Sequence, residues 1–159
     1  MLPRRRERNL RRLASTNKTE GDLLDFAYPR PQLQRSDWIS LNGTWRFRYD
    51  DERRFSQPGE IHDWPLDIMV PYPPESIASG IADRGFHRAC WYQRDFFLPL
   101  GDDRVIIRFG AVDYAARVWV NGRLAVTHEG GHTPFSADIT DLVGAKDRVE
   151  VQGGHTQVG

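Results

Sequence analysis

Arg117-Val-Trp-Val-Asn-Gly-Arg-Leu-Ala-Val126 is the clearest part of the stretch Trp91–Phe135, which decides the fold of this chain. Two runs rich in β-branched residues flank Asn121-Gly122, the residue pair that best tolerates the positive φ angles of a type I′ turn. We therefore predict a two-residue β-hairpin. Alternation along its first strand places Val118 on one face and Trp119 on the other, where Trp119 covers a second apolar surface or meets solvent.

Similar short runs lie on both sides of this hairpin. They are rich in β-branched and aromatic residues, and Gly, Pro, Asp and Asn separate them, which is typical of antiparallel strands in one sheet system. The runs within the deciding stretch are Cys90–Pro99, Arg104–Tyr114 and Glu129–Phe135.

The same patterns predict elements outside that stretch. Strict alternation in Thr44–Tyr49 predicts a strand with an aromatic core face, and the prolines that bound Trp64–Pro71 favour an edge strand. Asp147–Val151 alternates as a further strand. Ala137–Val143 suggests a helical turn that Asp138 caps at its start.

Composition restricts the class of protein. The chain has 159 residues, of which 39% are hydrophobic, and its 22 basic and 22 acidic side chains cancel. We therefore expect a soluble globular domain without a general affinity for nucleic acid or membrane. The single cysteine, Cys90, excludes an internal disulfide bond, and no apolar run has the length of a membrane span. We expect a cytoplasmic location.

Several motifs occur together in one order along residues 28–151. This combination resembles the N-terminal sugar-binding domain of glycoside hydrolase family 2, which holds β-galactosidases, β-glucuronidases and β-mannosidases. The motifs are Trp38–Phe47, Val70-Pro71 with Pro74-Glu75-Ser76, Trp91–Arg94, Arg108–Val112, Val118–Gly122 and Gly130–Phe135.

The resemblance implies an all-β fold, an antiparallel jelly-roll β-sandwich at residues 26–151. Residues 1–25 form a basic tail that we expect to be disordered, because it has too few apolar residues to offset the entropy lost on ordering. Residues 152–159 have neither strand nor turn pattern, so we expect an irregular tail and a sandwich that is incomplete at its C-terminus. A shifted or interrupted reading frame of a longer hydrolase gene would explain that tail.

Family members carry their two catalytic glutamates on a (β/α)8 barrel, which follows an immunoglobulin-like domain. Retaining hydrolysis needs such a pair about 5 Å apart across the glycosidic bond. This sequence has no recognisable substitute for the pair, so we predict that the chain alone is inactive and that it has no catalytic residue.

In the family, loops on one side of the sandwich approach the sugar in the catalytic barrel. The matching loop here predicts ligand contact by Glu75, Asp83, Arg84 and His87. The alternative for each is a loop cap or a solvated charge, because surface loops are polar by default.

Two further polar clusters have simpler interpretations. His128, Glu129 and His132 lie in a Gly-Gly loop without a compact third ligand, so we predict a structural or solvent role and no metal site. Asp50–Glu52 is expected to be solvated. We predict no cofactor.

Three functions fit these observations. The first is the non-catalytic sugar-binding domain of a family 2 glycoside hydrolase, whose ligand is a β-glycoside. The second is a free-standing carbohydrate-binding module, for which Trp64, Tyr72 and Trp91 could form an aromatic platform if they were not core residues. The third is a subunit that complements a separately encoded polypeptide bearing the barrel.

Overall fold

The computed structural model describes residues 38–99, 101 and 103–154, so the predicted basic tail at 1–25 lies outside the described residues. Within these described residues, two short 3₁₀ helices, η4 (Pro58–Glu60) and η5 (Ile77–Ser79), accompany eight strands. The strands are β1 (Gly43–Tyr49), β2 (Leu66–Val70), β3 (Ala89–Phe96), β4 (Ile106–Phe109), β5 (Ala115–Val120), β6 (Arg123–Glu129), β7 (Phe135–Asp138) and β8 (Asp147–Gly154). Within these ranges no helix is long and apolar enough to cross a bilayer.

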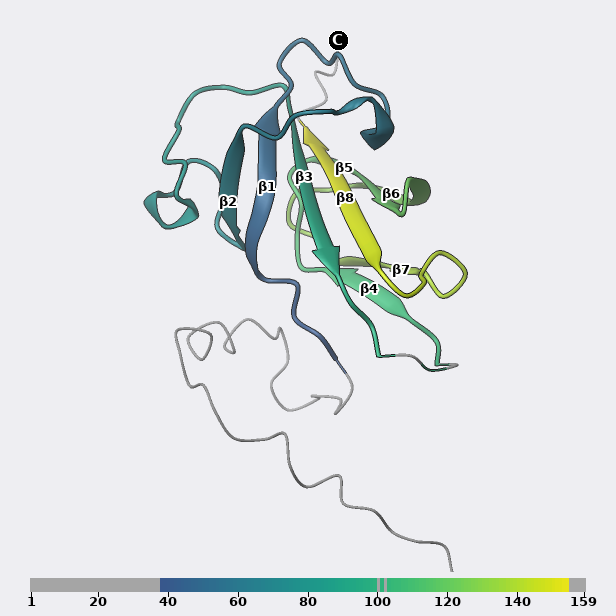
Figure 1. Ribbon diagram of the computed structural model, residues 1–159. Helices are drawn as coiled ribbons and strands as arrows, with labels where there is room; N and C mark the ends of the chain where they lie inside the picture. Colours follow the sequence, from purple (N-terminus) through teal and green to yellow (C-terminus); the bar gives the residue numbers. More distant parts are fainter. Residues whose placement is uncertain (1–37, 100, 102, 155–159) are drawn as a thin grey trace, which may run out of the picture. The chain divides into compact units, whose positions relative to one another are not determined.

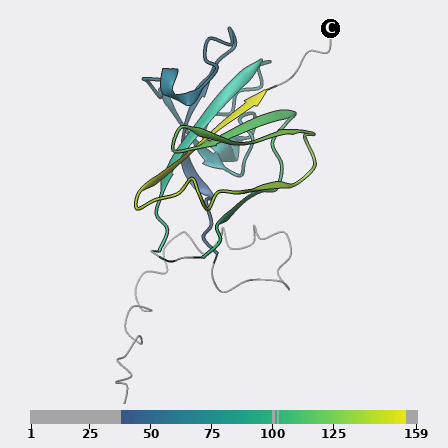
Figure 2. The same cartoon turned by 90° about the vertical axis from the view of Figure 1, so that its right-hand side faces the viewer.

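The strands form two antiparallel sheets. The larger has the order β2-β1-β3-β8-β5-β6, and the smaller pairs β4 with β7. Figure 1 shows β1, β3 and β8 side by side, with β2 beyond β1 at one edge. In the side view of Figure 2, the yellow β8 lies between teal β3 and the green β5–β6 hairpin. The predictions of an antiparallel sandwich and of an edge strand near Trp64–Pro71 are confirmed.

The main core lies between the two sheets. Phe47 on β1 is fully buried, and Trp45 is only 4% exposed, as the alternation in this strand predicts. Val118 on β5 and Ile107 on β4 belong to the same apolar cluster, so both sheets contribute to it. Burial of one face of each sheet therefore stabilises the sandwich.

The predicted hairpin is confirmed. Asn121 and Gly122 have φ angles of +52° and +76°, and they connect β5 directly to β6. Trp119 points to the outer face of the larger sheet, where its ring stacks on that of Trp91 at a centroid distance of 5.2 Å. The first alternative for Trp119 is therefore correct, because it covers a second apolar cluster.

The loop between β1 and β2 covers this outer pair of rings. Ile61 is buried against Trp91 and Trp119, and Phe55 and Trp64 are partly buried against the same cluster. Asp50 starts the loop and is only 4% exposed, so the prediction of a solvated Asp50–Glu52 cluster is wrong for its first member.

Asp50 is buried because its carboxylate satisfies three donors. It accepts hydrogen bonds from the backbone N–H groups of Arg54 at 2.8 Å and Phe55 at 3.2 Å, and from Trp91 Nε1 at 3.2 Å. These three hydrogen bonds offset the cost of removing the carboxylate of Asp50 from water. The sequence shows only a run of charged residues, which by itself suggests exposure to solvent.

Two predicted boundaries are also wrong. β8 continues through Gln152–Gly154, in contrast to the predicted irregular tail at 152–159; residues 155–159 lie outside the described part. Gly154 pairs with Ala89 on β3 and Ala115 on β5, and a Cβ at Gly154 would lie 2.7 Å from the carbonyl oxygen of Arg88. Glycine here reflects the close approach of the backbone at the start of β3, and it does not end the strand.

The predicted helical turn at Ala137–Val143 is replaced by the end of β7 and a hydrogen-bonded turn. Asp138 does cap this turn, since its carboxylate accepts hydrogen bonds from the backbone N–H of Thr140 at 3.1 Å and from its hydroxyl at 2.6 Å. The capping chemistry was therefore predicted correctly, but the helix was not. Asp and Thr favour such local hydrogen bonds in turns as well as at helix starts.

Candidate functional site

Residues 71–88 form the loop that joins the edge strand β2 to β3, and all four predicted ligand contacts lie on it. Ser79 fixes its middle: the hydroxyl is buried and donates to the carbonyl oxygens of Ser76 at 2.7 Å and Pro74 at 3.2 Å. The loop therefore has a defined conformation although it has little regular structure.

His87 holds the end of this loop against the sheet. Its Nδ1 lies 2.9 Å from a carboxylate oxygen of Asp51, and its Nε2 lies 3.2 Å from one of Asp83. The imidazole also stacks on the ring of Tyr49, with centroids 3.5 Å apart. Both ring nitrogens are thus occupied by this chain's own carboxylates, and the arrangement positions the loop.

Asp83 is an ionised member of this cluster. The backbone N–H of Gly85 donates to its carboxylate at 2.8 Å, and this bond, followed by the contact with His87, lowers the pKa of Asp83. The structure thus brings Asp83 and His87 together, two residues that the sequence analysis assigns to the same loop.

Glu75 and Arg84 are placed differently. Both side chains are exposed, and neither has a hydrogen bond or ion pair to another residue in the described part of the chain. They are the predicted site residues with polar groups available to an external ligand. Ligand contact by any of the four residues stays a prediction.

Sequence reasoning missed Asp51 and Tyr49 as partners of His87. Asp51 was assigned to a solvated cluster, but its second carboxylate oxygen also accepts a hydrogen bond from the backbone N–H of Arg88 at 2.9 Å. No local sequence signal identifies it, because Asp51 reaches this position through the pairing of Tyr49 at the end of β1 with Cys90 on β3.

Neutral groups lie beneath the cluster. Burial raises the pKa of Tyr49 to about 12 and that of the Cys90 thiol to about 11, and it raises the pKa of Tyr92 well above its ordinary value. Cys90 is therefore protonated at neutral pH, and a protonated buried thiol is a poor nucleophile.

The three aromatic residues that could have formed a sugar platform do not lie together on the surface. Trp91 is fully buried, Trp64 is partly buried against it, and Tyr72 is 41% exposed on the loop after β2. The interpretation of Trp91 as a core residue is confirmed.

His128 also has a structural environment. Its Nε2 lies 2.9 Å from the hydroxyl oxygen of Thr133, and its ring stacks on Phe135 at 4.3 Å. Over the residues that the structure describes, no group of three or more His, Cys, Asp or Glu side chains could hold a metal ion.

The sequence matches a known family over most of the described region. The family described as "Glycosyl hydrolases family 2, sugar binding domain" matches residues 54–153. Among curated relatives, the β-glucuronidase of Sus scrofa is 40% identical over 129 residues, covering 71% of this chain and 20% of that protein. The Mus musculus β-glucuronidase is 38% identical over 118 residues, covering 65% of this chain and 18% of that protein.

Solved structures agree with this match. A Faecalibacterium prausnitzii β-glucuronidase has a TM-score of 0.64 at 34% identity, covering 80% of this chain and 22% of that chain. A β-glucuronidase from Ruminococcus gnavus in complex with uronic deoxynojirimycin has a TM-score of 0.66 at 27% identity, covering 77% of this chain and 23% of that chain.

The chain spans about a fifth of the length of these relatives. Its antiparallel sandwich and the family match at residues 54–153 together give one conclusion. The chain belongs to the sugar-binding domain family of the family 2 glycosyl hydrolases.

Proposed function

We propose that this chain acts as the non-catalytic sugar-binding domain of a family 2 hydrolase that cleaves terminal β-glucuronides. The observation that carries the proposal is the loop 71–88, whose fold is fixed internally. Glu75 and Arg84 extend from it without a hydrogen-bond or ion-pair partner among the described residues. The β-glucuronidases among the relatives favour a uronic acid over a neutral sugar. A cytoplasmic location remains part of the proposal, and the free thiol of Cys90 is in keeping with it.

The two exposed side chains suit a uronic acid ligand. The guanidinium group of Arg84 can bind a carboxylate through two parallel hydrogen bonds, and the carboxylate of Glu75 can accept hydrogen bonds from sugar hydroxyl groups. His87 and Asp83 position the loop from which these groups extend. The proton transfers of hydrolysis belong to the part of the enzyme that carries the paired carboxylates.

A direct assay tests the non-catalytic role. The purified 159-residue chain is incubated with p-nitrophenyl β-glucuronide, β-galactoside and β-mannoside, and nitrophenol release is followed. We expect no hydrolysis of any substrate. Turnover by the chain alone that survives repurification would contradict the proposal.

A complementation assay tests the role in the hydrolase. The full chain is co-expressed with the Faecalibacterium prausnitzii β-glucuronidase from which the matching region has been deleted. We expect β-glucuronide hydrolysis in the mixture only. In that mixture Arg84→Gln should raise KM several-fold, whereas Glu52→Gln, an exposed change outside the loop, should leave KM unchanged.

The same assay separates the proposed role from one alternative, the free-standing module. Activity in the mixture is also what a separately encoded, complementing subunit would give. If the mixture hydrolyses no β-glucuronide while the chain alone binds glucuronate, a free-standing carbohydrate-binding module would be favoured. Equal KM values for Arg84→Gln and the parent chain would contradict the assignment of Arg84.

A further inference from the structure

The outer face of the larger sheet, which faces away from the main core, carries a row of polar side chains. Asp67 lies opposite Arg46, Arg46 opposite Gln93, and Gln93 opposite Glu150, so the row crosses β2, β1, β3 and β8. Residues directly opposite in antiparallel strands share a face and lie within side-chain reach. Arg46 donates from its guanidinium group to the side-chain oxygen of Gln93 at 3.0 Å.

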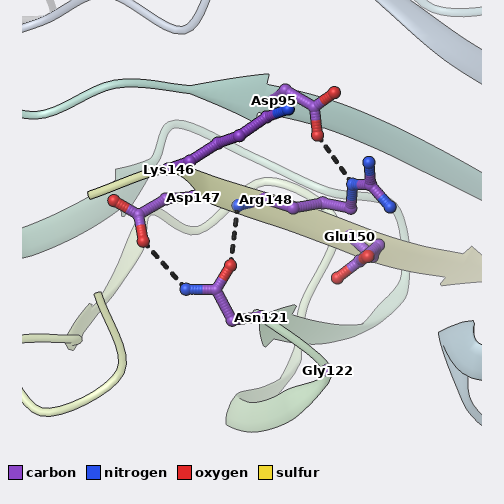
Figure 3. Close-up of a pocket in the computed structure, with 7 residues that line it drawn as sticks. All are labelled: Asp95, Asn121, Gly122, Lys146, Asp147, Arg148 and Glu150. Carbon is purple, nitrogen blue, oxygen red and sulfur yellow. Dashed lines mark hydrogen bonds and ion pairs between the residues drawn. The ribbon is translucent and has the colours of Figure 1, made fainter. Parts of the chain in front are cut away.

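Two adjoining clefts follow this row. The first, of about 350 Å³, is shown in Figure 3 and is lined by Asp95, Asn121, Gly122, Lys146, Asp147, Arg148 and Glu150. The second, of about 340 Å³, is lined by Thr44, Trp45, Arg46, Asp67, Gln93, Arg94 and Asp95. Asp95 lines both, and its carboxylate accepts a hydrogen bond from Arg148 Nε at 2.6 Å. We call the two clefts together the outer-face groove.

Glu150 is the unusual residue of the groove. It is only 5% exposed, and one of its carboxylate oxygens is buried with no hydrogen-bond partner in the part of the chain that the structure describes. Burial raises its pKa. Unsatisfied buried acceptors cost free energy, and a ligand that donates hydrogen bonds would remove that cost.

The charges of the groove indicate the class of ligand. On the outer face of the sheet, three acidic side chains line it and three basic ones oppose them: Asp67, Asp95 and Glu150 against Arg46, Lys146 and Arg148. This balance does not attract an anion or a cation from a distance. Dense donors and acceptors without net charge suit hydroxyl groups, each of which donates and accepts.

We propose that the outer-face groove is a second carbohydrate site that binds a neutral oligosaccharide, with Glu150 accepting hydrogen bonds from its hydroxyl groups. Two adjoining clefts along one line of strands fit consecutive sugar units. The groove lies at the end of β3 that holds Asp95, whereas the loop 71–88 enters β3 at Ala89. The proposal therefore needs neither β-glucuronide hydrolysis nor the exposed residues of that loop.

NMR titration of the full, ¹⁵N-labelled chain tests the proposal. The probes are cellotetraose, xylotetraose and mannotetraose, with glucuronate as the charged comparison. We expect at least one neutral tetrasaccharide to shift the amide signals of residues 93–95 and 146–150 in a saturable way at millimolar concentration. Glucuronate should leave these signals unchanged.

Two variants assign the contact. Glu150→Gln should raise the dissociation constant of the tetrasaccharide fivefold or more, because the amide has only one acceptor oxygen and no charge. This variant removes a buried charge, so it should be at least as stable as the parent, and weaker binding cannot be attributed to unfolding. Glu52→Gln, remote from the groove in the described structure, is the matched control and should bind as the parent does.

The outcomes that overturn the proposal are distinct from those that bear on the hydrolase. Shifts confined to residues 71–88 would place sugar binding at the loop alone and exclude the groove. Failure of all three tetrasaccharides to shift residues 93–95 and 146–150 would also overturn it, as would parent-like affinity in Glu150→Gln. None of these results depends on the complementation assay.

Discussion

Replacing Asp50 by asparagine should destabilise the chain by about 2–4 kcal/mol. One carboxylate oxygen of Asp50 accepts from Arg54 N–H, and the other accepts from Phe55 N–H and from the indole N–H of Trp91. An asparagine side chain retains one acceptor oxygen, so its best orientation satisfies two of the three donors.

The magnitude follows from these contacts. A donor left without a partner costs about 1–3 kcal/mol, and each remaining bond loses the gain of roughly 0.5–1 kcal/mol that a charged acceptor gives over a neutral one. A loss of this size is a large part of the 5–15 kcal/mol that is typical of whole domains. The loop from Asp50 to Trp64 should loosen first, because Asp50 ties its start to Trp91.

Urea unfolding followed by tryptophan fluorescence measures the effect, since the Trp91–Trp119 pair lies under that loop. The matched control is Glu52→Gln, which removes only a surface ion pair with Arg54 and should cost less than 1 kcal/mol. If the free energy of unfolding of Asp50→Asn lay within about 0.5 kcal/mol of that of the parent chain, the three hydrogen bonds would not be holding the loop.

Three further predictions follow from single residues. Phe47→Ala should lower the free energy of unfolding by about 3–5 kcal/mol, because its side chain is fully buried between the sheets; a loss below about 1 kcal/mol in urea melts would contradict that packing. Gly122→Ala should cost about 1 kcal/mol, because its φ is +76°, whereas Gly59→Ala, which has open space around its Cβ position, should be near neutral in the same urea melts. Burial raises the pKa of Glu150, so its ionised form opposes folding above the folded-state pKa, and this penalty disappears below the unfolded-state value. Glu150→Gln should therefore stabilise the chain most at pH 7 and progressively less toward pH 4, and a constant difference over that range would count against the burial of its charge.

Local patterns predicted the parts of the fold that local chemistry decides. The aromatic face of β1, the Asn121-Gly122 turn and the edge position of β2 follow from alternation, positive φ and proline placement, and the structure confirms each. Gly153 and Gly154 are the clearest failure. Two consecutive glycines suggest the end of a strand, but pairing with both β3 and β5 keeps them within β8. Such pairing depends on residues far apart in the sequence.

The candidate site was predicted as a loop and not as a set of contacts. The sequence placed Asp83 and His87 on one loop, but it could not show that Asp51 from another loop occupies the second nitrogen of His87. For the same reason the sequence does not identify Glu150 as a buried residue. Its place in an alternating strand indicates an outward side chain and says nothing of its burial. Cross-strand register supplies that information, because it brings Gln93 and Glu150 opposite one another.

The order of the strands has a consequence for how the chain folds. β8 comes last in the described sequence, yet it lies between β3 and β5 in the middle of the larger sheet. During synthesis β2-β1-β3 and β5-β6 can form early, but they cannot join until β8 leaves the ribosome. Until then β3 and β5 each have an unpaired edge, and such nascent edges are sites for chaperone binding and for misassembly. The many contacts between distant segments also predict slow folding, on the millisecond-to-second scale of β-sandwiches.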